Sequence, residues 1–354
     1  MDSNNRISWI DLSRMVAIFC VVLCHATETF YYFDVKHIST ISMSSKVFMF
    51  CCFTLGRIGV PIFLMISGYL LLDRKYDSGR TKSFWMNKWL HLLICTWIWF
   101  AIYDFYLVFF AKKNIGFLQF LEDMLFIHKV NMKNVWYMPM ILGIYILIPF
   151  VANGLKSVET SLLIFPVAIF GFFSFIVPSL EIINAVVKPE MPLVTQFSLG
   201  FSGGEYGLYL IFGYLIKKKC LKKIRLEILV TVGIVSFFAG VAFQIFAYAK
   251  GVQYNIWYDS PFILVTSVCL FECLSRIRRI YGYSIVRWIS YYSFPVYLIH
   301  YMICYSFADR IKELPVMQPV KILITWLLCL GGALICSWAI NKIPKVGKYI
   351  LYTK

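Results

Sequence analysis

Long uninterrupted stretches of apolar residues recur along this chain of 354 residues, and they limit its possible folds more than any other feature. The stretches are about 20 residues long, which is the length an α-helix needs to cross the hydrocarbon core of a bilayer. The composition agrees, because 60% of the residues are hydrophobic and only 15% are charged. Soluble domains rarely exceed about half apolar residues. The sequence therefore predicts an all-α integral membrane protein.

The apolar stretches predict about ten transmembrane helices around a polar central chamber. The predicted spans are residues 9–31, 47–72, 84–111, 135–153, 161–178, 204–216, 226–249, 260–275, 288–308 and 322–341. Residues 116–127 are better interpreted as an amphipathic helix at the membrane surface. We expect a single multi-spanning domain over residues 1–354, without an appended soluble domain.

Lysines and arginines outside the spans predict the orientation in the membrane. With a cytoplasmic N-terminus, the inner segments hold 20 of them and the outer segments 11. Because short cytoplasmic loops are enriched in Lys and Arg, both termini are expected in the cytoplasm. The loop at 112–133 is the exception, with four lysines on the outer side. The net charge of +16 thus reflects membrane orientation, and nucleic acid is not an expected partner.

Eleven cysteines occur in the chain, and all but one of them lie within the apolar stretches. In that environment cysteine is most simply a small apolar residue that fills space between helices. Their spacings match no zinc-binding pattern. We therefore expect no metal site.

The first apolar stretch carries ionisable residues at both ends, with Asp11 and Arg14 at its start and His25 and Glu28 at its end. Arg14 and His25 are 11 residues apart, which in an α-helix places them on one face, roughly 16 Å apart along the axis. Asp11 is spaced to pair with Arg14, and Glu28 is spaced to orient the His25 ring. Taken alone, this pattern fits a functional site and a membrane anchor with an interfacial histidine equally well.

Two other spans carry polar residues at a similar depth. Arg57 lies near the middle of the second span, where a charged side chain has to face protein or a water-filled cavity. The ninth span has one polar stripe, formed by Ser290, Ser293, Tyr297 and His300. Such stripes are also common in plain helix packing. Two histidines and an arginine at similar depth nevertheless predict a polar chamber.

Five segments carry a family resemblance, in order along the chain. They are RMVAIFCVVLCH (14–25), GRIGVPIFLMISGYLL (56–71), WYMPMILGIYILIP (136–149), YLIFGYLIKKK (209–219) and ISYYSFPVYLIH (289–300). Together they resemble the membrane-bound acyltransferase family three, multi-spanning O-acyltransferases that modify bacterial surface polysaccharides. The arginine, ten residues and histidine of the first segment are the hallmark of that family. The chain departs from it at Lys88 and His91, where relatives often carry closely spaced arginines, and at Asn134, where they often have histidine.

The resemblance implies that an acyl group, with acetyl as the first expectation, passes from cytoplasmic acyl-CoA to a glycan hydroxyl outside the membrane. Acetyl-CoA would be a co-substrate, and no permanently bound cofactor is expected. The implied acceptor is a glycan such as lipopolysaccharide O-antigen, capsule or exopolysaccharide. The implied location is the bacterial inner membrane, with the lipid bilayer around a multi-pass chain.

Four residues are candidates for the chemical step. A hydroxyl that attacks a thioester needs a base, and neutral histidine is suited to accept its proton near pH 7. His25, oriented by Glu28, is the first candidate base, and His300 is the second. Arg57 is suited to stabilise the developing oxyanion. The residues leave open whether the acyl group first forms a covalent histidine intermediate or passes directly to the sugar.

The two substrates need different surroundings. The phosphates of the donor need cations, and the cytoplasmic candidates are Arg14, held by Asp11, together with Lys82 and Lys88. Aromatic rings can stack on sugar faces, although rings are also common at membrane interfaces. The candidates for acceptor binding are Trp136, Tyr137 and Trp257.

A transporter or flippase of lipid-linked sugars is the alternative hypothesis, because it too would need a polar interior. Transporters of this kind often contain inverted repeats. No internal repeat is visible in this sequence. A cation and a histidine at opposite ends of one span therefore favour group transfer across the membrane.

Overall fold

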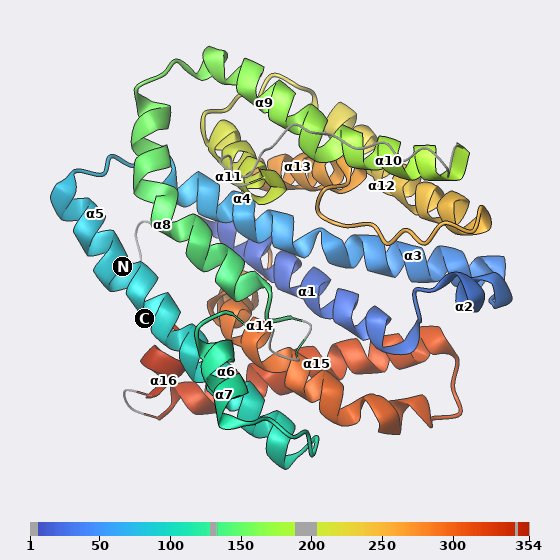
Figure 1. Cartoon of the computed structure of the whole chain (residues 1–354). Coiled ribbons are helices and arrows are strands. Elements are labelled where there is room, and N and C mark those ends of the chain that lie inside the picture. Colours follow the sequence, from blue (N-terminus) through green and yellow to red (C-terminus); the bar gives the residue numbers. More distant parts are fainter. Residues whose placement is uncertain (1–5, 128–131, 133, 188–203, 344–345, 354) are drawn as a thin grey trace.

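The computed structural model describes residues 6–127, 132, 134–187, 204–343 and 346–353. Within these residues all regular structure is helical, and no strand occurs. The axes of most long helices are roughly aligned, parallel or antiparallel, and extend from left to right in Figure 1. The predicted all-α class is therefore confirmed.

The described helices pack together in one bundle. Their bounds are α1 (Ser8–Phe30), α2 (Val35–Thr40), α3 (Met43–Arg57), α4 (Gly59–Leu71), α5 (Ser78–Phe84), α6 (Leu90–Phe109), α7 (Phe117–Met124), α8 (Tyr137–Lys156), α9 (Ile164–Gly171), α10 (Val177–Val187), α11 (Gly204–Lys217), α12 (Leu226–Ala249), α13 (Pro261–Ser275), α14 (Tyr283–Lys312), α15 (Gln318–Asn341) and α16 (Val346–Ile350). Two π-helical turns, Trp85–Trp89 and Phe172–Ile176, join α5 to α6 and α9 to α10.

Seven helical stretches in the described residues are long and apolar enough to cross a membrane. They are Ser8–Phe30, Met43–Leu71, Ser78–Phe109, Tyr137–Lys156, Thr160–Val187, Leu226–Ala249 and Gln318–Asn341. This is a multi-pass membrane protein. The other three predicted spans coincide with α11, α13 and α14, which are shorter or less apolar than the seven. The count of ten spans stays a prediction.

Two short helices flank the bundle. The helix predicted within residues 116–127 is confirmed as α7, and the indole of Trp97 donates a hydrogen bond of 2.8 Å to the Met124 carbonyl at its end. The helix α2 was not predicted from the sequence. It begins where the Asp34 carboxylate accepts a hydrogen bond of 2.8 Å from the His37 backbone, which is an ordinary N-cap.

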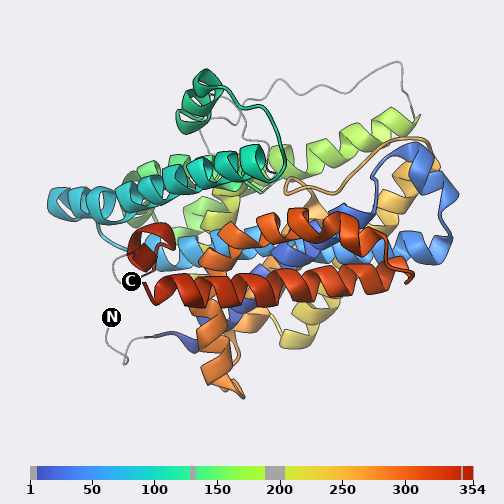
Figure 2. The same cartoon turned by 90° about the horizontal axis from the view of Figure 1, so that it is seen from below.

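The first helix is the centre of the bundle. Helices α3, α4, α14 and α15 all pack against α1, and Figure 2 shows the orange-red α14 and the red α15 side by side across it. Ala17 and Ile18 in the middle of α1 are completely buried. Because α1 is enclosed by other helices, the polar residues at its two ends face protein.

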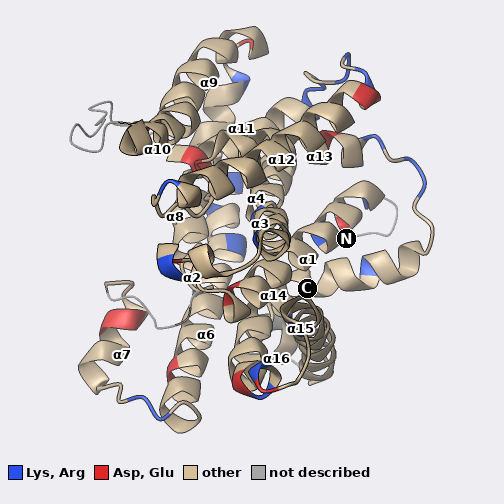
Figure 3. Ribbon diagram, turned by 90° about the vertical axis from the view of Figure 1, so that its right-hand side faces the viewer, with Lys and Arg blue, Asp and Glu red and all other residues tan. Residues whose placement is uncertain are grey.

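Charged residues are sparse along the helices, so most of the ribbon is tan in Figure 3. A bilayer disfavours charges at depth, and the buried Arg57 is accordingly paired with Glu28 at 2.9 Å. The start of α1 and the end of α15 lie at the same end of the bundle, on the left in Figure 1. This placement agrees with an even number of crossings.

The second predicted span, 47–72, is split at Ile58 into α3 and α4. Two glycines beside the break lie directly against α1. A Cβ on Gly56 would stand 2.6 Å from the Cα of Cys24, and one on Gly59 would stand 2.5 Å from the carbonyl oxygen of Ala17. Only glycine permits so close an approach of two helix backbones. The two glycines therefore hold the second span against α1 at the height of Arg57.

We predict that Gly59→Ala will destabilise the protein by about 1–3 kcal/mol, because the new methyl group forces α4 away from α1. The measurement is the melting temperature of the detergent-solubilised protein at a fixed scan rate. Gly143→Ala is the matched control, since a Cβ at that helical glycine meets nothing within 4 Å. Equal melting temperatures for the two variants would contradict the close-packing argument.

Candidate active site

The carboxylate of Asp11 joins the start of α1 to the start of α14. Asp11 is only 1% exposed and receives Nε of Arg6 at 2.7 Å and Nη1 of Arg14 at 3.3 Å. The hydroxyls of Tyr283 and Ser290 in α14 each donate to it at 2.7 Å. The predicted pairing of Asp11 with Arg14 is therefore present. So many donors leave Asp11 little capacity for a ligand, so we interpret it as a positioning residue for Arg14.

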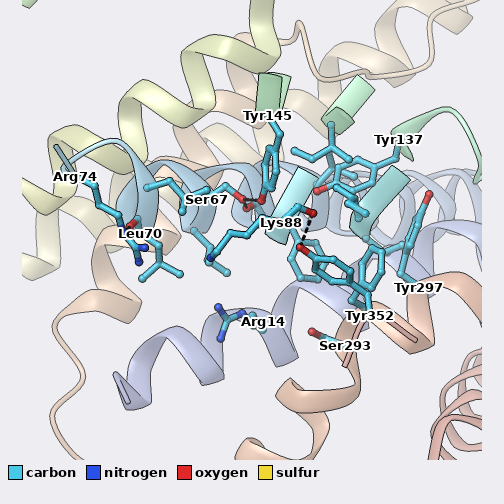
Figure 4. Close-up of a pocket in the computed structure, with 18 residues that line it drawn as sticks. Arg14, Ser67, Leu70, Arg74, Lys88, Tyr137, Tyr145, Ser293, Tyr297 and Tyr352 are labelled. Atoms are coloured by element: carbon cyan, nitrogen blue, oxygen red, sulfur yellow. Dashed lines mark hydrogen bonds between the residues drawn. The ribbon is translucent and has the colours of Figure 1, made fainter. Parts of the chain in front are cut away.

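Arg14 lines a cavity of about 400 Å³ bounded by residues of α1, α4, α6, α8 and α14 (Figure 4). Two further cationic side chains, Arg74 and Lys88, line the same cavity. Figure 4 shows the three cations toward one end of this chamber, and Tyr137 and Tyr297 toward the other. The remaining walls are largely apolar, so the chamber suits a ligand with an anionic head and a slender, less polar arm.

The C-terminal segment contributes to the chamber. The Tyr352 ring lines it, and the Tyr352 hydroxyl donates to the Lys88 carbonyl at 3.1 Å. Ile350, two residues before Tyr352, is bonded to α6, because the indole of Trp99 donates a hydrogen bond of 2.6 Å to its carbonyl. Opposite, the Ser67 and Tyr145 hydroxyls lie 3.0 Å apart. No sequence motif indicates that Tyr352 reaches this site, because its place depends on tertiary packing alone.

A second, smaller void of about 20 Å³ lies directly beside the chamber and is lined by His25 and Arg57. The walls of the two cavities have four residues in common. These are Val21, Val60, Tyr137 and Tyr297. The chamber that contains Arg14 and the space around His25 are therefore separated only by a thin wall of side chains.

His25, Glu28 and Arg57 form a connected group. One oxygen of the Glu28 carboxylate lies 3.0 Å from Nδ1 of His25, and the other lies 2.9 Å from Nη2 of Arg57. Because an ionised carboxylate only accepts hydrogen bonds, the proton of a neutral His25 ring lies on Nδ1, and Nε2 is then the nitrogen with the lone pair. The predicted orientation of His25 by Glu28 is present, and it leaves His25 in the tautomer that a general base needs.

The guanidinium of Arg57 is almost completely enclosed. It is 5% exposed and lies 4.1 Å from the ring centre of Trp257 and 4.5 Å from that of Phe53. Its Nη1 is 3.5 Å from the Tyr258 hydroxyl. Aromatic faces and one carboxylate together compensate the buried charge. The sequence identified Arg57, but its carboxylate partner across two helices was not predicted.

His300 lies next to His25, with ring centres 5.4 Å apart. It is fully buried, and its Nδ1 is 3.0 Å from the Val296 carbonyl, whereas its Nε2 has no hydrogen-bond partner among the described residues. His300 lines neither the chamber nor the small void. The geometry therefore favours His25 over His300 as the group that meets a substrate.

The aromatic candidates lie at different places. Trp136 lines the small void and packs on Trp257 and Tyr258, with ring centres 5.7 and 5.4 Å away. Tyr137 lines both the void and the chamber, so it stands at the wall between them. Asn134, buried beside Trp136, also lines the void. Trp257 lines neither the chamber nor the void.

The other basic candidates are not all brought to the chamber. Lys82 is exposed on α5 and does not line it. The basic run that follows α11 is engaged elsewhere, since Lys218 donates to Asp73 at 2.6 Å, a contact that raises the pKa of the lysine. Arg74 replaces them as the third cation of the chamber. Its position immediately after the second span was the available signal for it.

The fold and the site together define a multi-pass membrane protein with a cation-lined chamber that leads to an oriented histidine. Comparison with known proteins agrees with this class. A profile of the acyltransferase domain family matches residues 7–342, so the chain belongs to that family. The resemblance stated from the sequence is thus confirmed, and the family match favours acyl transfer over a transporter.

One curated relative is the peptidoglycan O-acetyltransferase OatA of Listeria monocytogenes. It is 25% identical over 70% of this chain, which spans 45% of the relative's own length. The chain thus corresponds to less than half of that protein. No solved structure matches the chain.

We predict that Glu28→Gln will lower the stability by about 3–5 kcal/mol, because it leaves the buried Arg57 charge without its counterion. The double variant Glu28→Gln with Arg57→Gln should be more stable than the single one, since no charge is then buried. Both are measured as melting temperatures in detergent. Glu227→Gln is the control, because its ion pair with Arg225 is largely exposed and contributes little. A double variant less stable than Glu28→Gln would show that the pair is not the cause.

Proposed function

We propose that this protein transfers an acetyl group from acetyl-CoA on the cytoplasmic side to a hydroxyl of a cell-envelope glycan on the outer side. The observation that carries the proposal is the contact between the two cavities, which share Val21, Val60, Tyr137 and Tyr297. A donor held at Arg14 needs only to displace this wall to bring its acyl end to His25.

The chamber suits the donor. The phosphates of CoA carry several negative charges. Three cationic side chains, Arg14, Arg74 and Lys88, line the chamber and can pair with them. The pantetheine arm is slender and only moderately polar, which fits the apolar and tyrosine-lined remainder. Asp11 and Arg6 would keep Arg14 in place while the donor exchanges.

The reaction balances with His25 as the base. Nε2 of His25 accepts the proton of the sugar hydroxyl while the oxygen of that hydroxyl attacks the thioester carbonyl. The new C–O bond forms, the C–S bond breaks, and the proton passes from the imidazolium to the CoA thiolate. Arg57 stands close enough to stabilise the negative charge on the carbonyl oxygen. Glu28 stabilises the imidazolium and holds the ring.

The acceptor follows from the relative. That relative is a peptidoglycan O-acetyltransferase, so a peptidoglycan-type polysaccharide is the first acceptor to test, before O-antigen, capsule or exopolysaccharide. The proposed location is the bacterial cell membrane, in agreement with the bacterial relative. The proposed cytoplasmic position of both termini is supported by the 20 inner against 11 outer basic residues.

Arg14 and His25 should fail in different ways when they are replaced. Arg14→Ala should weaken acetyl-CoA binding about tenfold or more, because it removes a cation from the phosphate site. His25→Ala should bind acetyl-CoA with nearly parental affinity and lose about 10²–10⁴-fold in transfer, since the base acts on the chemical step. Calorimetric binding of acetyl-CoA and acetylation of solubilised peptidoglycan strands measure the two effects.

Lys82→Ala is the control for these variants, because that lysine is exposed outside the chamber and should change neither reading. Substantial transfer by His25→Ala would move the role of base to His300. Parental binding and transfer in both variants would leave the arginine and histidine as a membrane anchor and contradict the proposed enzyme.

The orientation has its own test. A reporter that is active only in the cytoplasm, fused after Lys354, should be active, and one that requires export should be silent. The same pair of reporters inserted after Gly251, between α12 and α13, should give the reverse result. Export-dependent activity at Lys354 would invert the predicted topology.

A further inference from the structure

A third cavity, of about 280 Å³, lies between α10 and the segment that joins α12 to α13. Both elements are on the predicted outer side, at the opposite end of the protein from Arg14. We call this cavity the outer cleft. Its lining includes two serines, Ser179 and Ser260, and the larger polar and aromatic side chains of Glu181, Gln253, Tyr254, Asn255, Trp257 and Asp259.

The outer cleft is linked to the candidate active site through one side chain. Trp257 lines the cleft, and its ring also lies 4.1 Å from the Arg57 guanidinium. The indole nitrogen of Trp257 is held by the Tyr206 hydroxyl at 3.4 Å. A ligand in the cleft would therefore contact the same ring that covers Arg57, next to Glu28 and His25.

The lining has the chemistry of a sugar site. Indole and phenol rings present flat apolar faces to the C–H face of a pyranose, while amides and carboxylates pair with its hydroxyls. Two carboxylates, two aromatic rings and two amide side chains line the cleft. Each amide uses one atom within the protein, since Gln253 Nε2 donates to the Phe33 carbonyl and Asn255 Oδ1 accepts from the Tyr248 hydroxyl, both at 2.7 Å. Gln253 Oε1 and Asn255 Nδ2 are the amide atoms that would pair with a sugar hydroxyl. Its volume is close to the lower end of ordinary small-ligand pockets, about 300 Å³, which suits a short stretch of a chain.

The charge of the outer cleft adds selectivity. Glu181 and Asp259 are the charged residues among the described lining, and no lysine or arginine accompanies them there. Burial raises the pKa of Asp259 to about 6, and the carboxylates of Glu205 and Glu181 add to the effect. At neutral pH the cleft is therefore anionic and disfavours an anionic ligand.

We infer that the outer cleft binds an uncharged stretch of the acceptor glycan and discriminates against acidic sugars, with Trp257 between the bound chain and Arg57. This inference rests on the proposed function and adds the place and the charge preference of its acceptor.

The test is calorimetric binding of two tetrasaccharides to the full chain in detergent, one neutral (chitotetraose) and one anionic (tetragalacturonate). The parent should bind the neutral probe at least tenfold more tightly. Replacing both carboxylates, as Glu181→Gln with Asp259→Asn, should reduce that ratio to about threefold or less. Ser179→Trp, which places an indole in the cleft, should abolish binding of both probes.

Binding of acetyl-CoA, measured in parallel, should be unchanged in all variants and shows that they are folded. Glu227→Gln is the charge-matched control, since that exposed carboxylate at the start of α12 lies outside the cleft. Equal binding of both probes by the parent, or a ratio that the double replacement does not change, overturns the inference. Peptidoglycan acetylation that persists in Ser179→Trp overturns the cleft alone, whereas a parent that binds acetyl-CoA but acetylates no glycan overturns the proposed function.

Discussion

The charge of Arg57 is buried among membrane helices, and the surrounding structure has to compensate it. A guanidinium at this depth is costly unless it is paired and enclosed by polarisable groups. Glu28 of α1 supplies the counterion at 2.9 Å, and Trp257 covers the opposite face at 4.1 Å. The contact with Glu28 requires the second span to lie directly against α1, which Gly56 and Gly59 allow. The ion pair between Arg57 and Glu28 thus depends on the close packing of these helices.

The two ends of α1 have a similar arrangement of a carboxylate beside a candidate site residue. At each end a carboxylate holds the residue that would meet a substrate: Asp11 holds Arg14, and Glu28 holds His25. Each carboxylate is also bonded from a second helix, by Ser290 at one end and by Arg57 at the other. The cation and the base are therefore fixed at the two ends of one rigid helix. That arrangement suits a reaction whose two substrates arrive from opposite sides of a membrane.

Local spacing explains which parts of this site could be predicted from the sequence. The Asp11–Arg14 and His25–Glu28 pairs are three residues apart on one helix, so helix geometry alone places them together. The partners that come from other helices, Tyr283 for Asp11 and Arg57 for Glu28, depend on how helices pack, and no periodicity encodes that. The split of the second span at Ile58 was also not predicted, although the sequence holds a signal for it: Pro61 has no N–H to donate to the carbonyl of Arg57, the last residue of α3.

A thin wall of side chains separates the chamber from the void around His25. Under the proposed function, donor and acceptor arrive from opposite sides of the membrane, and such an enzyme must not become a water-filled pore. Val21, Val60, Tyr137 and Tyr297 lie between the chamber and the void around His25, and that void measures only about 20 Å³. With water largely excluded, the interactions of Glu28, His25 and Arg57 are stronger than they would be at a surface. These enclosed, low-dielectric surroundings are the ones in which the proposed role of Arg57, stabilising a developing negative charge, would be most effective.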